Sequence, residues 1–220
     1  MRIGLLGGSF DPPHSTHIEI AKLALSKFNL DKIVFVPSKI PPHRSKVIAS
    51  DEHRVKMLNL CFDNFASQKD EKSKFEISNI ELDRKDTSYT YFTLKSFHEN
   101  GYEGKELNKE NLFLIIGYDN FLIFEKWYRY EDILKMANVV VFSRDLGQVE
   151  DPEKQLKEQN SNLNFTFVND ILSDLSSTRV RLLIDKYYVN VKDEQTISEL
   201  NKTLSQDVLN YIIANQLYRS

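Results

Sequence analysis

Short apolar runs recur along the chain, separated by longer stretches in which polar and apolar residues mix. The runs are rich in β-branched and aromatic residues, or alternate apolar with polar positions, as buried and half-buried strands do. The predicted strands are residues 3–6, 32–36, 75–77, 112–116, 138–142 and 165–167.

Between these strands, apolar residues recur every three or four positions, which is the spacing of an amphipathic helix. The segments with this spacing are residues 18–28, 55–65, 92–97, 130–136, 180–184 and 204–218. Thr87 or Ser88 is expected to cap the third of these helices, and Ser176 or Ser177 the fifth, because hydroxyls accept the free N–H groups of a first turn. A strand, a helix and a second strand within about 36 residues favour a right-handed crossover between parallel strands, and hence an α/β fold.

The stretch after the first strand concentrates residues suited to phosphate. Gly7 and Gly8 come directly after the apolar run, so the backbone is expected to turn sharply there and to approach a ligand closely. His14 and His17 are three positions apart, which puts both on one face of the first helical turn. A helix N-terminus carries free N–H groups and a partial positive charge, so two imidazoles beside it predict a phosphate site. The alternatives are an ordinary glycine turn and a metal site at the histidines, although no acidic or cysteine partner stands nearby at metal-ligand spacing.

Polar residues gather at further strand ends, which matters because ligands of parallel sheets bind beyond the carboxyl ends of the strands. A loop at residues 37–46, rich in proline and cationic side chains, follows the second strand; composition alone fits a solvated basic loop equally well, and its place at this edge favours a ligand-binding loop. Gly117 and Asp119 follow the fourth, where the carboxylate suits either ribose hydroxyls or a helix N-cap. The fifth strand ends at Ser143 and Arg144.

Two further places suit a nucleotide. Ser176, Ser177 and Arg179 converge on one helix N-terminus and predict a second phosphate site; the alternative is a plain N-cap beside a surface arginine. Trp127 is the only tryptophan and has charged neighbours, so an aromatic platform for a flat ring competes with an ordinary core position.

Composition narrows the class of protein. The 220 residues suffice for one domain, 1–220, with a helical C-terminal part at approximately 174–220. A net charge of −3 argues against a nucleic-acid-binding protein. The single cysteine, Cys61, excludes an internal disulfide, fits a reducing compartment and is expected in the core. Neither a membrane span nor a secretory signal is evident, so a cytoplasmic protein is expected.

The motifs together resemble a known family. Nucleotidyltransferases that move an adenylyl or cytidylyl group have Gly-x-Phe-x-Pro-x-His-x-x-His behind a first strand, as here, and the chain resembles the bacterial nicotinate-nucleotide adenylyltransferases over nearly its whole length. Thr16 stands where the family motif has glycine, and Arg44 where the family usually has lysine. The segments that carry the resemblance are residues 7–17, 41–44, 87–90, 117–119, Trp127, 176–181 and the ending 211–218.

This resemblance implies a Rossmann-like doubly wound parallel sheet flanked by helices, and transfer of AMP from ATP to nicotinate mononucleotide with release of pyrophosphate. It implies that Mg²⁺ enters with ATP, with little or no protein ligation, and that His14, His17 and Arg179 are catalytic. The residues that would bind ATP are Gly8, Ser9, Phe10, His14, His17, Gly117, Asp119, Arg144, Ser177, Thr178 and Arg179. Those that would bind nicotinate mononucleotide are Gly8, Ser9, Phe10, Arg44, Ser88, Tyr89, Thr90 and Trp127.

Two alternatives stay open at this point. One is a nicotinamide-mononucleotide or other small-phosphate adenylyltransferase of the same superfamily, which differs mainly in the ring substituent of its substrate. The other is a non-catalytic nucleotide-binding regulator, against which the intact His14, His17 and Arg179 argue. No nucleic acid and no membrane is expected as a partner, and the oligomeric state, a homo-oligomer included, is left open.

Overall fold

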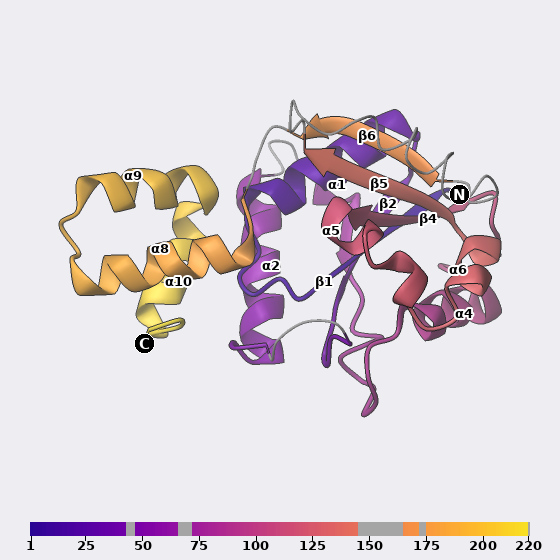
Figure 1. Ribbon diagram of the computed structural model, residues 1–220, viewed down its shortest axis with the longest axis horizontal. Coiled ribbons are helices and arrows are strands. Elements are labelled where there is room, and N and C mark those ends of the chain that lie inside the picture. The colour runs from indigo at the N-terminus through magenta and orange to yellow at the C-terminus, as the bar shows by residue number, and fades with distance from the viewer. Residues whose placement is uncertain (43–46, 66–71, 145–164, 172–174, 220) are drawn as a thin grey trace.

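A six-stranded parallel sheet forms the centre of the structure, a computed structural model that describes residues 1–42, 47–65, 72–144, 165–171 and 175–219 (Figure 1). The strands lie in the order β3-β2-β1-β4-β5-β6. This is the doubly wound, Rossmann-like order that the resemblance implied. Each predicted strand is present, and the bounds are β1 Ile3–Gly8, β2 Lys32–Pro37, β3 Phe75–Ile77, β4 Leu112–Gly117, β5 Asn138–Arg144 and β6 Phe165–Ile171.

Helices connect and cover the strands. In the described part of the chain they are α1 Ser15–Lys27, α2 Asp51–Phe65, α4 Thr90–Asn100, α5 Tyr118–Phe121, the 3₁₀ turn η1 Phe124–Lys126, α6 Tyr130–Met136, α8 Ser177–Val189, α9 Glu194–Thr203 and α10 Gln206–Ala214. α9 was not predicted, because Ile197 and Leu200 are its only apolar residues besides the threonine methyls. α10 is shorter than the predicted closing helix, and the backbone is left-handed at Gln216 and Tyr218 beyond its end. None of these described helices has both the length and the apolarity that a bilayer span requires.

The two faces of the sheet carry separate hydrophobic clusters. Successive residues of a strand point to opposite faces, so Leu6 joins one cluster and Leu5 the other. The first cluster packs under α1, α2 and the C-terminal helices, and the second under α4, η1 and α6. Cys61 lies in the first, and its complete burial raises the pKa of the thiol to about 12. The prediction of a core cysteine is therefore confirmed.

The C-terminal helices α8, α9 and α10 lie together at one end of the molecule, beyond α1 and α2 (Figure 1). Their buried residues, among them Val180, Leu200 and Ile212, belong to the same hydrophobic cluster as the residues of α1 and α2. The predicted helical C-terminal part is thus present and is packed against the helices that follow the first two strands.

Candidate active site

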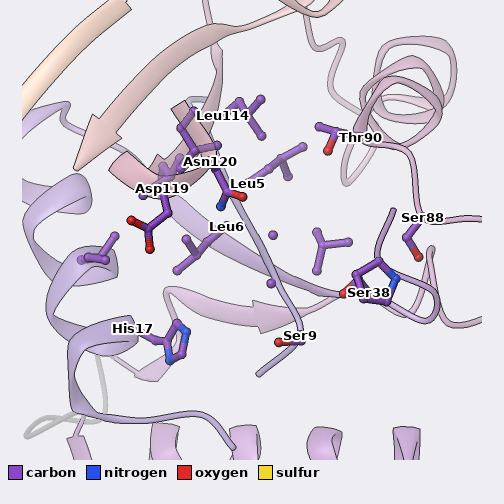
Figure 2. A pocket seen from close by; sticks show the side chains of 18 of the residues that line it. Leu5, Leu6, Ser9, His17, Ser38, Ser88, Thr90, Leu114, Asp119 and Asn120 are labelled. Carbon is purple, nitrogen blue, oxygen red and sulfur yellow. The ribbon is translucent and has the colours of Figure 1, made fainter. Parts of the chain in front are cut away.

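A cavity of about 300 Å³ lies at the carboxyl ends of β1 and β4, which are neighbours at the centre of the sheet. In a doubly wound sheet the strand order reverses at this point, which leaves a crevice between the loops on either side. Figure 2 shows His17 and Asp119 toward one side of the cavity and Ser38 and Ser88 toward the other. We call these sides the histidine end and the serine end.

Most of the residues singled out from the sequence line this cavity. They are Gly8, Ser9, His14, His17, Ser88, Tyr89, Thr90, Gly117, Asp119, Trp127 and Ser177. Arg44 lies outside the described residues. The backbone of Arg144 ends β5, but its side chain also lies outside the described part of the structure.

The glycines do not make the turn that was predicted for them. Gly7 and Gly8 are the last residues of β1 and pair with the end of β2, and the chain turns only afterwards, where Phe10 adopts a left-handed φ of 48°. A Cβ added at Gly7 or Gly117 would meet no described atom within 4 Å, although both residues line the cavity. A side chain at either position would therefore project into the cavity, and glycine keeps that space open for a ligand.

The two histidines begin α1 as a pair. His14 occupies the N-cap position, and its backbone N–H donates to Nδ1 of His17 at 3.2 Å. The ring centroids are 3.8 Å apart. Because Nδ1 of His17 accepts a hydrogen bond, a neutral His17 ring carries its proton on Nε2, which makes that nitrogen a donor. The pair thus places two imidazole rings at the histidine end of the cavity, beside the partial positive charge of the α1 N-terminus.

The side chain of Phe10 packs beneath the histidines and does not line the cavity. The residue is 1% exposed, and its ring packs edge-on against His17 with 4.9 Å between the centroids. The side chain therefore belongs to the core beneath the histidines and not to the surface of the cavity. Only the backbone of Phe10 remains for the predicted substrate contact.

Asp119 does not cap a helix. It lies inside the first turn of α5, whose N-cap position is held by Gly117. Its carboxylate faces the histidine end of the cavity (Figure 2). Of the two interpretations of Asp119, the geometry favours the one in which it accepts hydrogen bonds from a ligand.

The N-terminus of α8 also lines the cavity. Ser176 is the N-cap, as predicted, and accepts the N–H of Arg179 at 3.3 Å. Ser177 lines the cavity and donates its hydroxyl to the carbonyl of Pro12 at 2.9 Å. Thr178 and Arg179 are exposed and stand outside the cavity lining, with Nη2 of Arg179 4.0 Å from Oε2 of Glu199. A contact between Arg179 and a bound phosphate requires its side chain to swing inward.

The serine end is built around a hydroxyl that was expected elsewhere. Ser88 does not cap α4, where Tyr89 holds the N-cap position without a side-chain hydrogen bond. The hydroxyl of Ser88 instead accepts the N–H groups of Lys39 at 3.0 Å and Ile40 at 3.3 Å. These hydrogen bonds connect the segment before α4 with the loop that follows β2, and both segments line the cavity.

Glu81 is a cavity residue that the sequence did not reveal. The residue is 6% exposed, and its carboxyl accepts the hydroxyl of Thr93 at 2.7 Å. Burial raises its pKa to about 7, although hydrogen bonds from Thr93 and Ser88 and the charge of Arg84 oppose that rise. The residue opens the charged run 81–86, which in a sequence indicates a solvated surface. Only the tertiary packing of α4 shows otherwise.

Trp127 lines the cavity beside Tyr128. Its ring packs on Phe124 with 5.1 Å between the centroids, and Nε1 is buried with no acceptor among the described residues. A buried N–H without a partner is costly, and a ligand oxygen would remove that cost. Trp127 therefore packs on the core and also lines the cavity, where its role as a platform for a flat ring stays a prediction.

Comparison with known proteins agrees with this geometry. Residues 5–183 match the family model described as cytidylyltransferase-like. The chain is 32% identical to a probable nicotinate-nucleotide adenylyltransferase of Clostridium botulinum (strain Loch Maree / Type A3), over 98% of each chain. It is 33% identical to another of the same description from Listeria innocua, over 99% of this chain and 97% of that one.

Solved structures share the fold. A Plasmodium falciparum nicotinic acid mononucleotide adenylyltransferase, determined in complex with NaAD, superposes with a TM-score of 0.76 at 22% identity, over 99% of this chain and 97% of that one. A second structure of that enzyme, with the ligand APC, gives a TM-score of 0.73 at 20% identity, over 99% and 96% of the two chains. The shared fold, the family match and the identity over nearly full length show that this chain belongs to the nicotinate-nucleotide adenylyltransferases, within the cytidylyltransferase-like nucleotidyltransferases.

Proposed function

We propose that this chain transfers the adenylyl group of ATP to nicotinate mononucleotide, forming nicotinate adenine dinucleotide and pyrophosphate. The observation that carries the proposal is that one cavity has two chemically different ends. Paired histidines at a helix N-terminus occupy one end, and Ser88 and Thr90 occupy the other. Tyr89 follows Ser88, and its ring contacts that of Tyr128, the neighbour of Trp127 in the sequence. Two nucleotides bound from opposite ends would bring their phosphates together beside Gly8 and Ser9, at the end of β1.

ATP is assigned to the histidine end. His17 can donate from Nε2 to oxygens around the α-phosphorus, and the N-termini of α1 and α8 supply N–H groups for phosphates. Asp119 suits the ribose hydroxyls, because an ionised carboxylate is an acceptor of two hydrogen bonds or more. Arg179 would reach the β and γ phosphates after the side-chain movement described above.

Nicotinate mononucleotide is assigned to the serine end. The pyridine ring fits against Trp127, whose buried N–H lacks a protein acceptor among the described residues. The N-terminus of α4 begins at Thr90 and offers its first N–H groups to the carboxylate of the ring. Arg44, which lies outside the described residues, is retained as a candidate cation for the same substrate.

The reaction needs no group of the protein to become covalently attached. An oxygen of the mononucleotide phosphate attacks the α-phosphorus of ATP, the new P–O bond forms, and the bond between the α-phosphorus and the bridging oxygen breaks. Pyrophosphate leaves with that electron pair. The chain contributes by aligning the two phosphates and by stabilising the charge that shifts between their oxygens.

Mg²⁺ is proposed as the companion of ATP. Among the described residues, no cluster of three or more His, Cys, Asp or Glu side chains could hold a metal ion. Asp119 and Glu81 are the carboxylates that line the cavity among the described residues. A site of this kind fits an ion whose ligands are mainly phosphate oxygens and water; when bound, it would neutralise phosphate charge.

Pyrophosphate release tests the proposal. The purified chain would be incubated with Mg²⁺, ATP and one of three acceptors: nicotinate mononucleotide, nicotinamide mononucleotide or phosphopantetheine. We expect the highest kcat/KM with nicotinate mononucleotide and formation of the dinucleotide in equal amount to pyrophosphate. A higher kcat/KM with the amide would change the assigned substrate, and absence of turnover with every acceptor would favour the regulatory alternative.

A further inference from the structure

The loop between β1 and α1 is held by side chains from two helices far away in the sequence. Three of its carbonyl groups accept a hydrogen bond each. Ser9 O accepts from Nη1 of Arg54 at 2.6 Å, Asp11 O from Nη1 of Arg181 at 2.6 Å, and Pro12 O from Ser177 at 2.9 Å. The donors come from α2 and α8. This loop, residues 9–13, leads directly into His14 and His17.

The side chain of Asp11 is the centre of the arrangement. It is 3% exposed, and its two carboxyl oxygens accept three hydrogen bonds. Oδ2 accepts the N–H of Ile48 at 2.7 Å, and Oδ1 accepts the N–H of Ala49 at 3.1 Å and the hydroxyl of Tyr218 at 2.7 Å. A buried carboxylate is costly unless its oxygens are satisfied, so each of these donors helps to fix where the loop lies.

Tyr218 stands out among these donors because it is 207 positions away in the chain. It lies beyond the end of α10 with a left-handed φ of 60°, an unusual conformation for a residue other than glycine. Burial, together with the negative charge of Asp11, raises the pKa of its hydroxyl far above the ordinary value. The hydroxyl therefore stays protonated and remains a donor.

We propose that Tyr218 is a positioning residue for adenylyl transfer, which holds, through Asp11, the loop that presents His14 and His17 to ATP. The proposal rests on the proposed function, because it assigns ATP to the histidine end. Tyr218 itself is not among the residues that line the cavity, so it acts on the reaction only through the loop.

The size of the effect follows from how the loop would relax. Without the Tyr218 hydroxyl, Asp11 keeps two backbone donors and Arg181, Arg54 and Ser177 still hold three carbonyls. The loop should stay in place on average but become less well fixed. Misplacement of reacting groups by about 1 Å can cost roughly a hundredfold in rate, so a partial loosening should lower kcat about tenfold.

Tyr218→Phe is the decisive variant, and Tyr211→Phe is its matched control. Tyr211 lies on α10, and its hydroxyl contacts Nδ1 of His53 on α2 at 2.9 Å, rather than a residue of the loop. Each substitution removes one tyrosine hydroxyl from a contact between the C-terminal segment and the rest of the molecule. We expect Tyr218→Phe to lower kcat about tenfold and Tyr211→Phe to leave it within about twofold, at similar changes in Tm. Equal kcat values in the two variants would overturn the proposal.

A double-mutant cycle separates positioning from a general loss of stability. If Tyr218 acts through the histidine loop, Tyr218→Phe should change kcat far less in a His17→Ala background than in the wild type. The same tenfold loss in both backgrounds would contradict the proposal. Failure of the proposed function itself is recognised separately, because the wild-type chain would then form no dinucleotide.

Discussion

Glu81 should make the stability of the protein fall as the pH rises through neutrality. An ordinary glutamate in an unfolded chain has a pKa near 4.5, whereas burial raises the pKa of Glu81 to about 7 in the folded protein. Between these values the native state holds a proton that the unfolded state has released. Stability therefore decreases with pH across this window, since the side with more bound protons is favoured at low pH.

The magnitude follows from the two pKa values. The gap between 4.5 and about 7 corresponds to roughly 3 kcal/mol of unfolding free energy over the whole window. Between pH 5 and pH 8 most of that gap is crossed, so about 2–3 kcal/mol should be lost from this carboxyl group alone. Its 6% exposure means that little water is available to screen the effect.

Urea unfolding at pH 5, 6, 7 and 8 measures this, with Glu81→Gln as the perturbed variant. Gln stays neutral and can still accept the Thr93 hydroxyl, so it mimics the protonated acid. We expect the stability of the wild type relative to Glu81→Gln to fall by about 2–3 kcal/mol from pH 5 to pH 8. For Glu99→Gln, on the exposed face of α4, the free energy of unfolding should depend on pH in the same way as for the wild type. If the free energy of unfolding of Glu81→Gln also shows the pH dependence of the wild type, Glu81 has an ordinary pKa and the reasoning from burial is refuted.

Three substitutions test the assigned roles directly. His17→Ala should lower kcat roughly a hundred- to a thousandfold while leaving the fold intact, since it removes a preorganised donor near the reacting phosphorus; a destabilised but fully active enzyme would contradict this role. Trp127→Ala should raise KM for nicotinate mononucleotide more than KM for ATP, because lost stacking is mainly lost uniform binding, and an equal rise in both would remove Trp127 from the pyridine site. Gly117→Ala should raise KM for a substrate while leaving Tm within a few degrees, because the added methyl meets only the open cavity; unchanged kinetics would show that no substrate comes close to Gly117.

The strands, and the end of the sheet at which the cavity lies, could be predicted because they depend on local patterns. The run Leu112 to Ile116 has the composition of a buried strand wherever it stands, and parallel strands bring their carboxyl ends together whatever their loops contain. His14 and His17 were paired correctly because a spacing of three residues is a property of the helix itself. These features need no knowledge of distant contacts.

The features that were missed depend on packing between distant segments. The hydroxyl of Ser88 could cap the helix next to it in sequence. It instead accepts hydrogen bonds from the amides of Lys39 and Ile40, which lie nearly fifty positions earlier. Glu81 stands in a charged run and is buried only because α4 folds over it. Likewise, the glycines after the first strand suggested a turn, whereas the left-handed residue is Phe10, held there by packing beneath His17. In each case the local pattern had two outcomes, and a tertiary contact decided between them.

The buried Cys61 gives the protein an internal reporter of its own opening. It is the only cysteine in the sequence, and its side chain on α2 is completely buried. Because burial raises the pKa of this thiol to about 12, almost none of it is in the reactive thiolate form at neutral pH. An alkylating reagent can therefore modify it only when the core around α2 opens. The rate of that single modification measures the free energy of opening in native buffer, without denaturant. Arg54 on α2 donates to the carbonyl of Ser9 in the loop of residues 9–13. Substrates that stabilise this loop should therefore slow the alkylation of Cys61, so the rate of alkylation would report on ligand binding at the cavity.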